Sequence, residues 1–170
     1  MTLLARLFGS KPDPREALVP LWQWSVQTAR DPRWYRDGGV ADSVSGRFDM
    51  VVHVLALVML RAEHGPDAAE RTARLTELFV DEMDGQLREE GVGDVVVGKR
   101  VGKLMQALGG RIAALRSSSD DAAAREAAVR RNITFVEGGG DPALVVADLT
   151  ALEARLAAAD DAALLAGQVP

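Results

Sequence analysis

Two acidic side chains, Asp81 and Asp84, come nearest in this 170-residue chain to a reactive arrangement. Residues three apart lie on one face of a helix, so the two carboxylates could act as an acid–base pair or hold a hard cation. A simpler interpretation competes with both, because carboxylates that share a surface with Arg and Lys side chains usually form a salt-bridge network. We expect a salt-bridge network here.

The other residues capable of chemistry do not form a recognisable site. His53 and His64 have no second histidine at helical spacing, and the chain has no cysteine, which excludes the usual type of zinc site. We expect His53 to be a core or groove residue. The glycines at 91 and 93 follow an expected helix, whereas the dinucleotide-binding fingerprint follows a strand. No catalytic residue, cofactor or metal is predicted, and the chain is not expected to be an enzyme.

A helical hairpin is expected to position the charged residues. Leu75, Phe79, Met83 and Leu87 recur every fourth residue, which places them on one side of a helix. The glycines at 91 and 93 can end that helix, and Asp94 can cap the next one. The second helix repeats the apolar spacing at Val97, Val101, Leu104, Met105, Leu108, Ile112 and Leu115. So short a link predicts that the two helices run antiparallel.

Charged side chains follow both helices of the expected hairpin. The first helix carries a mainly acidic stripe, and the second carries a basic one: Glu77, Asp81, Asp84 and Arg88, then Lys99, Arg100, Lys103 and Arg111. Fixed charges of both signs on rigid elements are typical of a specific docking surface. Exposed charges can also do no more than solvate the surface of a fold. The sequence supports the two interpretations about equally.

A very apolar helix is expected from Arg47 to about Glu63, and such a helix belongs at the centre of a bundle. Arg47 begins this helix, at an end where the helix dipole disfavours a cation. We therefore expect Arg47 to pair with a carboxylate, with Asp81 and Asp84 as the candidates. Further helices are expected over 15–29, after Asp67, over 122–135 and after Asp141, with a turn at 34–39.

Composition supports an all-α, single-domain bundle of about six helices with a central antiparallel hairpin. Hydrophobic residues make up 48% of the chain, which suffices for a core, and aromatic residues only 5%. The formal net charge of −5 argues against general nucleic-acid binding. Residues 13–160 are expected to form the helical domain, with 1–12 as a tail or short surface helix and 161–170 as a loose tail.

No apolar stretch is long enough to span a membrane. The longest, Met50–Leu60, is about half of the ~20 residues needed. Residues 1–8 are too short for a secretory signal. They are expected to pack on the domain, with a weak membrane-surface anchor as the alternative. The expected location is the cytoplasm, with a peripheral position on the cytoplasmic face of the inner membrane as the variant.

Several short motifs together resemble the ubiquinol–cytochrome c chaperone family over roughly Leu18–Asn132. They are Gly46-Arg47-Phe48, Asp81-Glu82-Met83-Asp84, Leu87-Arg88-Glu89, Gly91-Val92-Gly93-Asp94, Val97-Gly98-Lys99-Arg100 and Gly110-Arg111. The resemblance implies a helical assembly factor of the cytochrome bc1 complex. The chain departs from the pattern at Gly102, Leu108 and Gly109, where relatives are expected to carry a lysine and bulky aromatics.

What the resemblance implies is a chaperone that binds newly made cytochrome b or an early bc1 intermediate, with the ribosome and a small partner protein as further candidate partners. The candidate binding residues are Arg47, Phe48, Asp81, Asp84, Arg88, Asp94, Lys99, Arg100, Lys103 and Arg111. An apolar surface groove near Phe48 and Trp34 is expected to receive the client. The alternative is a helical carrier or enzyme for a quinone, lipid or haem, which would require an internal apolar pocket.

Overall fold

The computed structural model describes residues 13–65, 67–89 and 94–170, with side chains described outside 86–100. Six helices of eleven residues or more lie within this part of the chain: α2 (Val19–Ala29), α4 (Val44–Ala62), α5 (Ala68–Glu89), α6 (Asp94–Ser117), α7 (Ala122–Asn132) and α8 (Pro142–Ala158). Short helices η1 (Glu16–Leu18), α3 (Pro32–Arg36) and α9 (Asp161–Leu165) complete it. The predicted all-α bundle is confirmed.

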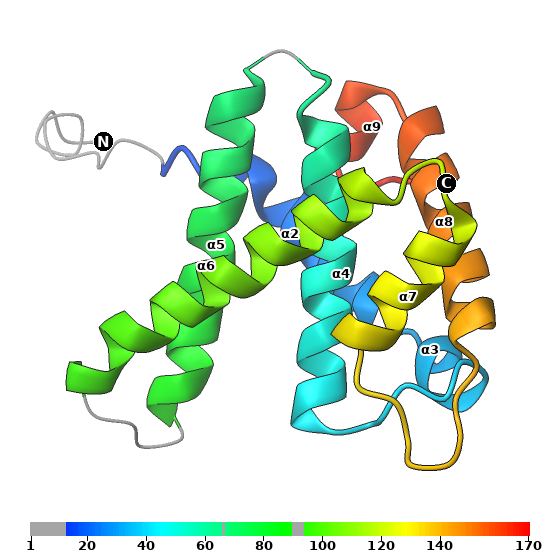
Figure 1. Cartoon of the computed structure of the whole chain (residues 1–170). Helices are drawn as coiled ribbons and strands as arrows, with labels where there is room; N and C mark the ends of the chain where they lie inside the picture. The colour runs from blue at the N-terminus through cyan, green and yellow to red at the C-terminus, as the bar shows by residue number, and fades with distance from the viewer. Residues whose placement is uncertain (1–12, 66, 90–93) are drawn as a thin grey trace, which may run out of the picture.

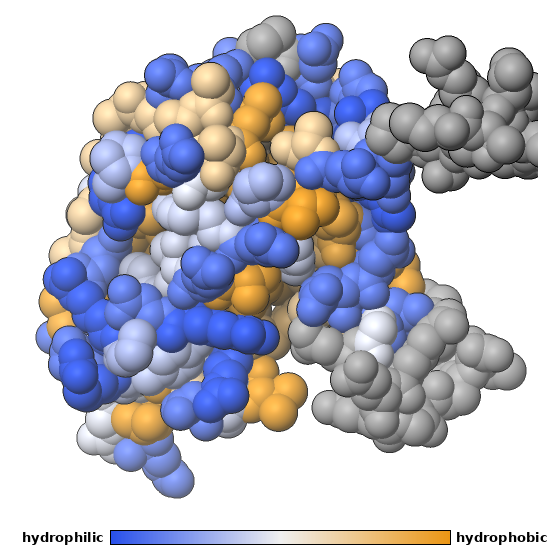
Figure 2. Space-filling model, turned by 180° about the vertical axis from the view of Figure 1, so that it is seen from behind, coloured by the Kyte–Doolittle hydropathy of each residue, from blue (hydrophilic) through white to orange (hydrophobic). Residues whose placement is uncertain are grey.

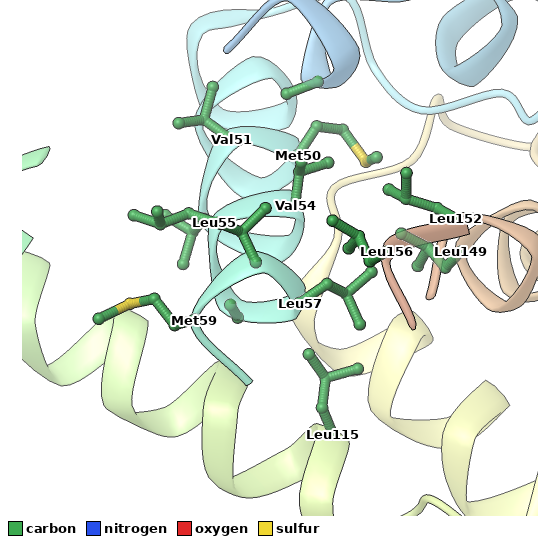
Figure 3. Close-up of a cluster of buried hydrophobic side chains, with 14 of the residues drawn as sticks. Met50, Val51, Val54, Leu55, Leu57, Met59, Leu115, Leu149, Leu152 and Leu156 are labelled. Carbon is green, nitrogen blue, oxygen red and sulfur yellow. The ribbon is translucent and has the colours of Figure 1, made fainter. Parts of the chain in front are cut away.

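Helix α4 stands at the centre of the bundle (Figure 1). All ten residues from Met50 to Met59 are buried, so this helix has neighbours on every side. Its side chains meet leucines of α8 and Leu115 of α6 in one apolar cluster (Figure 3). The apolar sequence of α4 therefore predicted its position correctly.

The expected hairpin consists of α5 and α6. Helix α6 packs far more extensively on α4 than on α5, and it crosses the bundle obliquely (Figure 1). Leu75 and Phe79 of α5 are fully buried in the core. The end of the hairpin, where α5 finishes and α6 begins, projects beyond the other helices (Figure 1). The hairpin thus covers one side of α4 and extends past it.

Side-chain caps determine where several helices begin. Ser43 accepts a hydrogen bond from the Gly46 amide at 3.2 Å and starts α4. The same role falls to an aspartate at four other starts: Asp31, Asp121, Asp141 and Asp160. Each cap satisfies an amide that the first turn leaves without a partner.

Two segments differ from the sequence expectation. Residues 34–39, expected as a turn, belong partly to α3, because Asp31 caps that helix and Pro32 suits its first position. The second segment, residues 161–170, was expected to be loose but packs on the bundle, with Leu164 fully buried. Asp161 accepts hydrogen bonds from Arg61 at 3.0 Å and Arg71 at 2.9 Å, which lowers the pKa of its carboxyl.

Candidate functional site

A surface groove of about 430 Å³ lies where α2, the start of α4, α5 and α6 converge. Its walls are largely apolar, with charged groups at the rim: Val26, Arg30, Val44, Ser45, Arg47, Phe48, Val51, Glu82, Met83 and Leu104. Figure 2 views the molecule from behind, where apolar side chains reach the surface between hydrophilic ones and the surface is hollowed beside the hairpin. The groove is open to solvent and lies at the edge of the packed core around α4.

The floor of the groove is held by stacked aromatic rings. Phe48 is half-buried, and its ring centroid lies 6.5 Å from that of Phe79 at an interplanar angle of 30°. Phe79 also meets the edge of Trp22, with centroids 6.2 Å apart. Offset and edge-on contacts of this kind stabilise aromatic clusters. Phe48 therefore presents one face to the groove from a rigid base.

The start of α4 is positioned by a close backbone approach at Gly46. A Cβ atom at this position would lie 2.0 Å from the Ala41 carbonyl oxygen, which is closer than atoms can pack. Only glycine lets the preceding segment pass so near the helix. The adjacent residues Arg47 and Phe48 are thereby directed to the groove.

Arg47 pairs with Asp42, so the expectation that Asp81 or Asp84 would be its partner is wrong. The Nε of Arg47 donates to Oδ1 of Asp42 at 2.6 Å, and this bond lowers the pKa of Asp42. The reason is local, because Asp42 lies just before the start of α4 and Arg47 lies at the end of its first turn. Asp81 instead accepts a hydrogen bond from Arg15.

A second, more polar hollow of about 680 Å³ adjoins the groove. Arg30 and Arg47 line both hollows, and the second is completed by Pro32, Tyr35, Arg36 and Asp42. Arg30 is exposed, and its guanidinium makes no hydrogen bond or ion pair with any residue that the structure describes. The site therefore has an apolar end towards α5 and α6 and a cationic end towards α3.

Among the ten predicted binding residues, the six whose side chains the structure describes do not gather on one surface. Arg47 and Phe48 line the groove, and Lys103 is exposed on α6. Asp84 is half-buried on α5 and is itself engaged in an interaction. The remaining members of the hairpin set lie outside the residues whose side chains are described: Arg88, Asp94, Lys99 and Arg100.

Arg111 lies inside the protein, only 9% exposed, so its inclusion in a surface site is wrong. It donates to Asp49 at 2.8 Å and to the side chain and carbonyl of Asn132. The other oxygen of Asp49 accepts from the amide and hydroxyl of Thr134, at 3.0 and 2.7 Å. This network fastens α6 to α4 and to the end of α7, so Arg111 maintains the fold that carries the groove.

His53 is a core residue, 2% exposed at the middle of α4. Burial, with the nearby charges of Arg111 and Arg125 acting in the same direction, lowers its pKa from 6.5 to about 3. Its Nδ1 has no hydrogen-bond partner in the described part of the chain. Among the described residues no group of three or more His, Cys, Asp or Glu side chains could hold a metal ion.

Several groove residues escaped the sequence predictions. Met83 and Leu104 were expected on buried helix faces. Both are only partly buried, because the hairpin extends beyond the other helices. No motif or spacing in the sequence around Arg30 indicates that it lies in the groove. Trp34, expected beside the groove, is buried with its Nε1 donating to the Thr28 carbonyl at 2.7 Å.

None of the helices in the described residues has the length and apolar character needed to cross a bilayer. Among curated proteins, none matches this chain. Among solved structures, the crystal structure of the Cbp3 homologue from Brucella abortus is similar, with a TM-score of 0.78 and 28% sequence identity. The similarity covers 98% of this chain and 95% of that one. A family model described as ubiquinol-cytochrome C chaperone matches residues 36–169. The chain therefore belongs to the ubiquinol–cytochrome c chaperone family.

Proposed function

We propose that this protein is an assembly chaperone of the cytochrome bc1 complex that binds newly made cytochrome b, or an early assembly intermediate containing it, in the groove between α2, α4, α5 and α6. Membership of the family supports the assembly role. The observation that carries the binding site is the open apolar groove with charged rims. An integral membrane client exposes apolar segments until its partners join, and such segments bind apolar grooves.

The position of the hollow favours a protein client over a carried small molecule. The interior around α4 is filled by side chains, and the groove lies at the surface. A carrier of a quinone, lipid or haem would enclose most of its ligand. We therefore propose a binding protein that is not an enzyme. Its place at the cytoplasmic face of the inner membrane and its contacts with the ribosome or a small partner protein are proposals from family membership alone.

Affinity capture from solubilised membranes tests the proposal with a matched pair of variants. Leu104→Asp places a charge on the groove wall, whereas Met105→Asp places the same charge one residue along α6, on an exposed side chain outside the groove. Burying an unpaired carboxylate against apolar client surface is unfavourable. We expect cytochrome b to co-purify with the wild type and with Met105→Asp, and to be lost from Leu104→Asp.

Folding of both variants is checked by circular dichroism and thermal unfolding. Retention of cytochrome b by folded Leu104→Asp at the wild-type level would refute the groove as the client site. Failure of the wild-type protein to capture cytochrome b or any bc1 intermediate would refute the proposed function itself.

A further inference from the structure

We infer that the groove recognises a client segment made of two parts, an apolar stretch followed by carboxylates that bind Arg30 and its neighbouring arginines. The inference rests on the proposed function, because it specifies the chemistry of the polypeptide that this function requires. It follows from the different character of two adjoining hollows that share Arg30 and Arg47 in their walls, the groove as the apolar end and the second hollow as the cationic end.

The apolar end lies between the hairpin and the start of α4. Phe48 and Val51 come from α4, while Met83 and Leu104 face them from α5 and α6. Methionine adapts its shape to different apolar partners, and an aromatic ring offers a large, stiff contact. This end is suited to an apolar face of a helix or to an extended apolar stretch.

The cationic end carries three arginines, Arg30, Arg36 and Arg47. Arg47 is paired with Asp42, but both side chains are more than 60% exposed, so that pair is worth little and can exchange partners. Arg36 contacts Asp37 at 3.2 Å, also at the surface. Arg30 makes no ion pair with any described residue and is available to a carboxylate from outside.

Charge complementarity identifies the occupant as acidic. The chain carries a formal net charge of −5, so an acidic segment is repelled by most of the molecule and attracted to this end of the groove. A guanidinium binds a carboxylate with two parallel hydrogen bonds, which sets direction as well as position. The arginines therefore determine the orientation of the client, while the apolar end supplies most of the contact.

Labelled synthetic peptides test this preference. Three helical peptides share one apolar face and end in Glu-Glu, Gln-Gln or Lys-Lys, and their binding is measured by fluorescence anisotropy. We expect the Glu peptide to bind the wild type about two- to fivefold more tightly than the Gln peptide, from the strength of exposed ion pairs. The Lys peptide should bind most weakly, and high salt should reduce the differences.

Charge reversal provides the decisive comparison. Arg30→Glu should invert the order, so that the Lys peptide binds best, whereas Arg116→Glu, an exposed arginine outside both hollows, should leave the order unchanged. If the wild type binds the Glu and Gln peptides equally and Leu104→Asp abolishes the binding of both, this inference is overturned. The groove itself would still be supported as the client site.

Vesicles separate a protein client from a lipid. The same variants are sedimented with vesicles of phosphatidylcholine containing phosphatidylglycerol. Binding that depends on Arg30, together with no preference for the Glu peptide, would overturn the inference in favour of an anionic lipid surface. No binding of any peptide, combined with capture of cytochrome b by folded Leu104→Asp, would overturn both the inference and the groove assignment.

Discussion

The fold should lose stability in mildly acidic solution, because the imidazole of His53 takes up a proton there only when the chain unfolds. Its pKa falls from an ordinary 6.5 to about 3, chiefly through burial and then through the charges of Arg111 and Arg125. Between these two values the unfolded chain binds a proton that the folded chain does not. Stability is therefore complete above pH 6.5 and decreases as the pH falls towards 3.

The magnitude follows from the distance below pH 6.5. At pH 5, which is 1.5 units below the ordinary pKa of 6.5, protonation stabilises the unfolded chain. At about 1.4 kcal/mol per unit, the free energy of unfolding should fall by about 2 kcal/mol. Urea unfolding at pH 7.5, 6.5, 5.5 and 5.0 measures this slope. Carboxylates whose pKa is lowered, such as Asp42 and Asp161, change the free energy of unfolding only below about pH 4. They therefore do not affect the measurements between pH 7.5 and 5.0.

Replacement of each histidine isolates the effect. His53→Leu keeps an apolar side chain in the core and should remove most of the slope between pH 6.5 and 5.0, whatever its stability at pH 7.5. His64→Gln changes the other histidine, which is exposed, and serves as the control. An equal slope in wild type and His53→Leu would refute the assignment of acid sensitivity to the buried imidazole.

Three further predictions concern the framework of the groove. Arg111→Met should lower the free energy of unfolding by about 3–5 kcal/mol in urea titrations, because Asp49 is left buried without its ion pair; adding Asp49→Leu should recover part of this loss, and a larger loss would contradict the pairing. Leu164→Ala should cost about 2–5 kcal/mol, since the side chain is fully buried, and an unchanged melting temperature would show that α9 does not pack as described. Gly46→Ala should cost about 1–3 kcal/mol through its clash with the Ala41 carbonyl and should weaken cytochrome b capture beyond that expected from stability alone; normal capture by the folded variant would argue against a precise position for the start of α4.

Periodicity predicted the helices well because it reports local geometry. The apolar run after Phe48 identified α4 as the central helix, and the repeated apolar spacing before Glu89 and after Asp94 predicted α5 and α6. The family motifs, carried by residues from Gly46 to Arg111, indicated the family that the comparison confirms over residues 36–169. These signals lie within short stretches of sequence, where spacing alone is informative.

The candidate site was less predictable because its residues meet only through tertiary structure. Arg111 has a surface-like charge, yet its partners Asp49 and Asn132 are 62 and 21 residues away in sequence and draw it inside. Leu104 belongs to an apolar stripe, but the projection of the hairpin leaves it at a groove wall. A repeat of apolar residues shows which face is shared and does not show how far the neighbouring helix extends.

The projecting end of the hairpin leaves the two walls of the groove unequally supported by neighbouring helices. One wall belongs to α2 and α4 inside the bundle, and the other to helices whose far ends extend beyond it (Figure 1). We therefore expect substitutions in the far wall to change how quickly a client enters and how long it stays more than they change the melting temperature of the bundle. Residence time on the chaperone would then vary largely independently of its thermal stability.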